Sequence, residues 1–306
     1  MARLRTIRLT ALNIVTHPHS PANYVDLLYD ILDIDDPVQV RGTKASIITM
    51  LWTSDEDSFW PKSDKKKVPK SVSGIIATFD RINFGADWLS LKSKKSATEN
   101  ELAEIRIPRH IHPNAQYFLF TFFPRKHVMY VVTEQQYDRL TPGAAATVFR
   151  KFCEKDAIAS KYGKVEVSVL PDQEKLEEIF RLPRMRKVHL EFALPNPDQF
   201  DDPSKGVYKR FKKMGAGRVV QELTALATEK LTPDHELKTY MQVAADNGYV
   251  TAEGSDDQGK KIVLSTRDHP YKAELQYDPK LQTEVQAFEL RAYQLYGQLP
   301  KSKDAE

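Results

Sequence analysis

The stretch that decides the fold runs Tyr117-Phe118-Leu119-Phe120-Thr121-Phe122-Phe123, then Pro124-Arg125-Lys126-His127, then Val128-Met129-Tyr130-Val131-Val132-Thr133. Two apolar runs thus flank a short polar turn. β-Branched and aromatic residues favour a pleated strand, and a run with almost no polar alternation must be covered on both faces. The sequence therefore predicts a β-hairpin at the centre of a sheet.

Strand and helix patterns alternate on both sides of this hairpin. Residues 5–15 begin as an alternating strand and become continuously apolar, and Ser20-Pro21 then offers an N-cap and a first-turn proline for a helix. Further strands are predicted at 46–52, 72–79, 165–170 and 188–194, and helices at 142–161 and 173–181. This order predicts an α+β fold with a mixed, largely antiparallel sheet and flanking helices.

The strongest break in the pattern is Pro195-Asn196-Pro197-Asp198. We expect a sheet-rich α+β domain over residues 1–198 and a smaller, mainly helical domain over residues 199–306. Helices are predicted in the second domain at 205–214, 218–231, 234–246 and 281–296. A β-hairpin is expected at 249–266, because Asp256-Asp257-Gln258-Gly259 has suitable turn chemistry.

Composition places the chain among globular proteins. The 306 residues are 41% hydrophobic and 28% charged, which differs from the low hydrophobicity of a disordered chain. No apolar run approaches the roughly 20 residues of a membrane span, and residues 1–8 lack the apolar region of a secretory signal. We therefore predict a cytoplasmic protein with no membrane partner. Cys153 is the only cysteine, so an internal disulfide is excluded, and we expect it to be buried.

Local charge is more informative than the net charge of +3. In the helix predicted at 205–214, four lysines at spacings of three and four share one face: Lys205, Lys209, Lys212 and Lys213. Val207, Phe211 and Met214 form the opposite, apolar face. The break Gly215-Ala216-Gly217 allows close backbone approach, and a helix beginning at Arg218 would present free amides to a phosphate.

These features predict a non-catalytic protein that binds the phosphate backbone of nucleic acid without a cofactor. The predicted contacts are Lys205, Lys209, Arg210, Lys212, Lys213, Gly215, Gly217 and Arg218, with the loop lysines Lys65, Lys66 and Lys67. A solvated helix face followed by a glycine turn is the structural alternative. A protein–protein adaptor or homo-oligomer, in which the basic clusters only increase solubility, is a further hypothesis.

A metal-dependent nuclease or hydrolase is the alternative from another functional class. Its ligands would be the two His-x-His pairs, His17 with His19 and His110 with His112. In extended backbone the two histidines of each pair project to the same face, as metal ligands must. The adjacent Pro18 and Pro113 favour ordinary loop entries instead.

Several stretches resemble an uncharacterised bacterial family, a domain of unknown function of about this length. They are Leu12-Asn13-Ile14-Val15 with His17-Pro18, the helix containing Tyr24 and Leu27-Leu28, Val40-Arg41-Gly42, residues 246–254 (Asp246 to Gly254), and Leu264-Ser265-Thr266 with His269-Pro270. The resemblance covers nearly the whole chain and implies a bacterial cytoplasmic protein. The resemblance assigns no catalytic residue to this chain. It implies that the protein is part of a mobile-element or antiphage defence system, with nucleic acid or phage components as partners.

Overall fold

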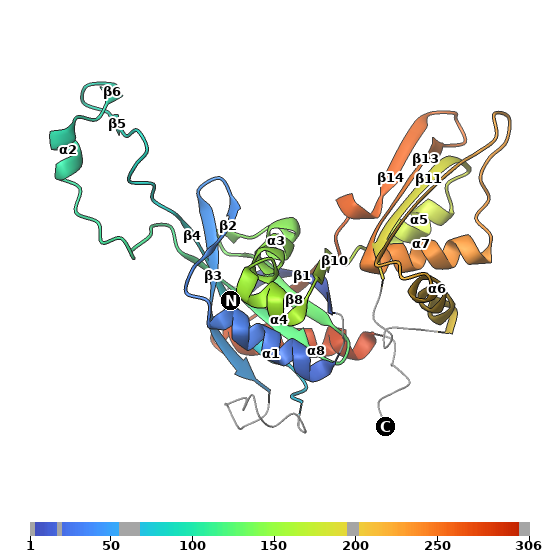
Figure 1. Cartoon of the computed structure of the whole chain (residues 1–306), viewed down its shortest axis with the longest axis horizontal. Coiled ribbons are helices and arrows are strands. Elements are labelled where there is room, and N and C mark those ends of the chain that lie inside the picture. The colour runs from blue at the N-terminus through green and yellow to red at the C-terminus, as the bar shows by residue number, and fades with distance from the viewer. Residues whose placement is uncertain (1–3, 17–19, 55–67, 195–201, 300–306) are drawn as a thin grey trace.

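Two main sheets, each covered by helices, and one projecting arm make up the structure (Figure 1). The computed structural model describes residues 4–16, 20–54, 68–194 and 202–299. Every strand pairing within these residues is antiparallel. The predicted α+β class is therefore confirmed.

The larger sheet has the predicted hairpin at its centre. Its strands follow the order β10-β1-β8-β7-β4-β3-β2, with β15 against β1 and β9 against β8. The bounds are β1 Arg5–Thr16, β2 Val38–Arg41, β3 Lys44–Thr53, β4 Val72–Asp80, β7 Gln116–Phe123, β8 Val128–Gln135, β9 Asp138–Arg139, β10 Val165–Val169 and β15 Ala273–Tyr277. Phe118, Phe120, Met129 and Val131 are fully buried, as the apolar pattern of the hairpin required.

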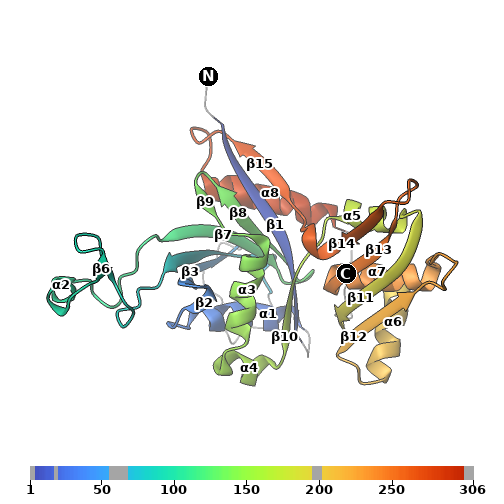
Figure 2. The ribbon, with the colours of Figure 1, turned by 90° about the horizontal axis from the view of Figure 1, so that it is seen from above.

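Helices cover both faces of the central strand β7. They are α1 Pro21–Leu32, α3 Pro142–Cys153, α4 Asp156–Tyr162 and α8 Glu284–Gln298. Phe120 packs edge-on against Phe149 of α3, whereas Phe123 stacks on Tyr296 of α8, and residues three apart in a strand point to opposite faces. Helix α3 contacts both β2 and β10, the two ends of the main strand order, so the sheet curls around it (Figure 2).

The smaller sheet has helices on one face only. Its strand order is β12-β11-β13-β14, with bounds β11 Arg184–Ala193, β12 Arg218–Thr224, β13 Gly248–Ser255 and β14 Lys261–Ser265. Helices α5 Gln173–Phe180, α6 Asp202–Lys213 and α7 His235–Asn247 complete this unit. Val188, Leu190 and Phe192 of β11 are buried in its hydrophobic core. The hairpin expected at 249–266 forms, because β13 pairs with β14.

The helix predicted at residues 218–231 is wrong. Residues Arg218–Thr224 form β12, which pairs with β11 along its whole length. Val219 faces the core while Val220 is exposed, which is the alternation of a strand. Because β-branched residues lose little freedom in a strand, pairing with β11 outweighs the helical spacing of the apolar residues.

The smaller unit is inserted between two segments of the larger one. The Tyr271 amide donates to the Leu170 carbonyl at 2.8 Å, and Pro171 forms an isolated bridge with Pro270. Strand β11 belongs to the second sheet, whereas β15 and α8, which follow the second unit in the chain, pack in the core of the first unit. This division of the chain at residues 171 and 270 differs from the expected boundary after 198, and the break at 195–198 lies outside the described residues.

A long arm, residues 81–115, projects from the end of β4 away from both sheets (Figure 1). It contains β5 Leu89–Ser90, β6 Lys95–Ser96 and the short helix α2 Glu99–Ala103. At its base, the Asn114 side chain donates to Asp80 at 2.7 Å, which joins the two ends of the arm. Within the described ranges, neither the arm nor the two units contain a helix that is long and apolar enough to cross a membrane.

Candidate functional site

Helix α6 is fixed to the second core by one side. Val207 is buried, and the Phe211 ring packs edge-on against Phe192 with ring centres 6.1 Å apart. Phe211 also lies 6.0 Å from the ring of Tyr240 in α7. These contacts fix the rotation of α6 about its axis, so they determine which side chains face solvent.

The solvent side of α6 is basic. Lys209, Lys212 and Lys213 are exposed, and the ammonium group of Lys212 lies 5.1 Å from the centre of the Tyr208 ring. In the described part of the chain, no carboxylate forms an ion pair with these three lysines, whereas Lys205 is half-buried. The predicted lysine face is therefore present as an exposed surface, hereafter the α6 basic face, defined as Lys209, Lys212 and Lys213.

The arginines predicted for this site have structural partners. Arg210 donates to the Glu236 carboxylate at 2.9 Å and to the Tyr240 hydroxyl at 2.7 Å, so it holds α6 to α7. Arg218 forms an ion pair with Glu191 on the second sheet. Because both guanidinium groups already have acceptors, they are poorer phosphate ligands than the lysines.

The glycine turn after α6 does not start another helix. Gly215 has a φ of +70°, the left-handed conformation that ends helices, and the Ala216 amide donates back to the Phe211 carbonyl at 3.0 Å. The Gly217 carbonyl accepts from Leu194, and β12 begins at the next residue. The expected helix N-terminus at Arg218, with amides free for a phosphate, is therefore wrong.

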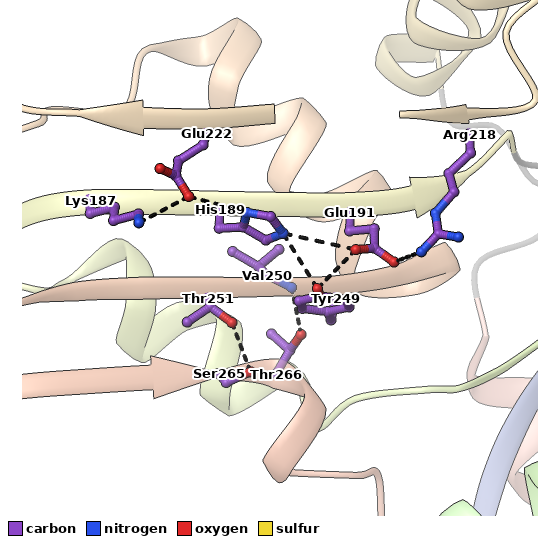
Figure 3. A network of polar contacts seen from close by, with 10 residues as sticks. All are labelled: Lys187, His189, Glu191, Arg218, Glu222, Tyr249, Val250, Thr251, Ser265 and Thr266. Atoms are coloured by element: carbon purple, nitrogen blue, oxygen red, sulfur yellow. Dashed lines mark hydrogen bonds and ion pairs between the residues drawn. The ribbon is translucent and has the colours of Figure 1, made fainter. Parts of the chain in front are cut away.

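A polar network covers the face of the second sheet that lacks helices (Figure 3). Lys187 pairs with Glu222 at 3.0 Å, and Glu222 also lies 3.5 Å from Nδ1 of His189. The Tyr249 hydroxyl donates to Glu191 at 2.9 Å. Sequence reasoning missed this cluster, although the alternation Lys187-x-His189-x-Glu191 in β11 could have indicated a polar sheet face.

Charges in this network neutralise one another. Burial alone would raise the pKa of Glu191, but the hydrogen bonds from Arg218 and Tyr249 and the nearby positive charges lower it. The hydrogen bond from Lys187 lowers the pKa of Glu222. Because each carboxylate stays ionised beside a cation, this face presents little net charge to a polyanion.

The histidines predicted as metal ligands do not converge in the described residues. His110 is exposed, while His112 stacks on Phe79 with ring centres 4.9 Å apart. His17 and His19 lie outside the residues that the structure describes, as do Lys65, Lys66 and Lys67. Within the four described ranges, no group of three or more His, Cys, Asp or Glu residues could hold a metal ion. Cys153 is buried, which raises the pKa of its thiol to about 12.

Comparison with known proteins identifies a family without assigning a site. A family model described as a domain of unknown function (DUF4747) matches residues 5–292. The match spans both sheets, the arm and helix α6. No curated protein matches the chain.

Proposed function

Because the chain belongs to the family described as a domain of unknown function, DUF4747, we propose its function from its own surface. We propose that it is a non-catalytic protein that binds the phosphate backbone of nucleic acid through the α6 basic face. The observation that carries this proposal is the exposure of Lys209, Lys212 and Lys213, without ion-pair partners among the described residues, on a helix whose opposite side is fixed by Phe211.

The spacing of these lysines suits a phosphate backbone. Four residues of helix rise about 6 Å, so Lys209 and Lys213 can reach different phosphates of one strand. Lysine is a flexible point charge, and contacts to phosphate oxygens carry no sequence information, so the surface would not discriminate between sequences. Binding of this kind releases counterions and weakens steeply as salt is added.

Charge reversal of the α6 basic face tests the proposal. The K209E/K212E/K213E variant should lose affinity for labelled duplex DNA, single-stranded DNA or RNA, to a similar extent for every sequence tested. Its plot of log affinity against log salt should become shallower by roughly 2 to 3, since each lost phosphate contact removes about 0.9 from the slope. Its melting temperature should fall by only a few degrees, because these lysines pair with no described carboxylate, although negative charge in the last turn of α6 opposes the helix dipole.

The arm offers a matched control. Lys92, Lys94 and Lys95 are also exposed, and K92E/K94E/K95E makes the same change in net charge. This control should keep its affinity and salt slope. Equal losses in both variants would mean that overall charge, and not the α6 basic face, controls binding. No binding of the unmodified protein to any nucleic acid at about 50 mM salt would favour a protein–protein adaptor instead.

A further inference from the structure

A second basic surface lies in the first unit, far from α6 in the fold. An open hollow of about 530 Å³ forms between the edge strand β2, the turn that follows it and the end of α3. The cationic side chains that line it are Arg41, Arg81, Lys151 and Lys155, and none of its lining residues is acidic. The hollow is shallow and open to solvent, so a ligand there would be held mainly by contacts with these charges.

The lysines and arginines of the hollow differ in their partners. Lys151 pairs with Glu154 at 2.7 Å, and Lys155 pairs with Asp36 at 2.6 Å. The hydrogen bond from Lys155 is the main cause that lowers the pKa of Asp36, and the nearby charge of Arg81 adds to it. In the described chain no carboxylate lies within 4 Å of the Arg41 or Arg81 guanidinium. The hollow therefore keeps an excess of two positive charges.

Backbone hydrogen bonds fix the main chain beside the two arginines. The Arg81 amide donates to the Thr43 carbonyl at 2.8 Å, which ties the end of β4 to the turn between β2 and β3. Asp80 accepts from Lys44 at 3.1 Å, so this carboxylate is directed to Lys44 and not to the hollow. Gly42 has a φ of +53°, and an added Cβ there would meet no atom within 4 Å, so a ligand has open access to the turn.

We propose that this hollow binds a phosphate-bearing ligand, with Arg41 and Arg81 as the main donors and Lys151 and Lys155 as supporting charges. A guanidinium group presents a planar fork that matches two oxygens of one phosphate, so two neighbouring guanidinium groups suit a diphosphate better than point-charge lysines do. Pro37, Val38 and Val40 add an apolar wall for the rest of the ligand. The phosphate belongs either to a free nucleotide or to the 5′-phosphate of a nucleic acid end. The site is independent of the α6 basic face, which lies on the second unit.

Isothermal titration calorimetry of the full chain tests this site. The probes are inorganic pyrophosphate, ADP, and a short thymidine oligonucleotide with and without a 5′-phosphate. The R41Q/R81Q variant removes both charges from exposed side chains and should weaken pyrophosphate binding at least about tenfold. R106Q/R109Q is the matched control, because these two arm arginines are also exposed and make no ion pair among the described residues. It should bind pyrophosphate as the unmodified protein does.

The same titrations identify the source of the phosphate and separate the two proposals. Tighter binding of ADP than of pyrophosphate supports a nucleotide site. Tighter binding of the phosphorylated oligonucleotide than of its unphosphorylated form supports recognition of a nucleic acid end. K209E/K212E/K213E should keep pyrophosphate binding whether or not it loses duplex binding. The inference is overturned if pyrophosphate binds the unmodified protein more weakly than about 1 mM, or if R41Q/R81Q binds it unchanged while melting at the same temperature.

Discussion

At the scale of single residues, the packing of the second sheet leaves no space for a side chain at Gly248. A Cβ added there would lie 1.9 Å from the carbonyl oxygen of Glu191 and 2.7 Å from Cα of Phe192. The φ of Gly248 is 178°, which any residue adopts, so glycine is needed for space and not for conformation. Gly248 pairs with Phe192 at the end of the β11–β13 ladder, where the two backbones approach closely.

Replacing Gly248 with alanine should therefore lower the free energy of unfolding by about 3 kcal/mol, since the backbone of β11 must move. Urea denaturation monitored by circular dichroism measures this change. Gly206 in α6 is the matched control, because an added Cβ there meets nothing within 4 Å. Gly206→Ala should leave stability unchanged or raise it by up to about 1 kcal/mol. A similar loss in both variants would contradict the proposed clash.

At the scale of elements, strands and helices with a clear local pattern were predictable, whereas a strand whose apolar spacing also fits a helix was not. The hairpin β7–β8 and the helix α1, with Ser20 as its N-cap, follow from local patterns that agree with their surroundings. The lysine face of α6 was equally predictable, because helical spacing fixes it. Strand β12 was not, because its pairing with β11 comes from elsewhere in the chain. The hollow also could not be predicted from the sequence, because Arg41, Arg81 and Lys151 are far apart in the chain. They line one hollow only because the sheet curls around α3.

The polar face of the second sheet should make stability depend on pH. The pKa of Glu191 is lower in the folded protein than in the unfolded chain. Its ionised form therefore stabilises the fold at pH values above its unfolded pKa, about 4.3, and this contribution disappears as the pH falls through the lowered folded value.

Glu191→Gln should accordingly cost about 1 kcal/mol at pH 7, because the partly exposed pair with Arg218 is screened by solvent. The difference between the variant and the unmodified protein should shrink as the pH falls below about 4. Urea denaturation of both proteins across this range measures it. A difference that stays constant with pH would show that packing, and not the charge of Glu191, was lost.

At the scale of the whole molecule, the chain passes between the two units twice, and the two crossings lie side by side. The chain leaves the first unit after Leu170 and returns at Tyr271, and these residues share a backbone hydrogen bond of 2.8 Å. A further contact between the units is the Asn13 amide, which donates to the Asn247 side chain at 3.0 Å. Each unit nevertheless has its own hydrophobic core.

Removing the insertion should leave the first unit folded. A protein in which residues 172–269 are replaced by a short Gly-Ser linker keeps β15, α8 and the whole first core, so it should unfold cooperatively on heating. A fragment of residues 1–198 is the comparison, because it lacks β15 and α8 and should not show a cooperative transition. Cooperative melting of that fragment, or its absence in the linked protein, would contradict this division.

The pairing of β1 with β15 also sets an order of events on the ribosome. Residues Arg5–Leu9 of β1 can pair with β15 only after residues Ala273–Tyr277 have been synthesised. Strand β8 and the whole second unit are synthesised earlier. At roughly 5–20 residues per second, this strand edge stays open during translation for on the order of ten seconds. Open edges promote aggregation, and charge on the edge opposes it. Arg8 places a positive charge on this edge, and in the finished sheet it pairs with Glu134 on one side and Glu274 on the other.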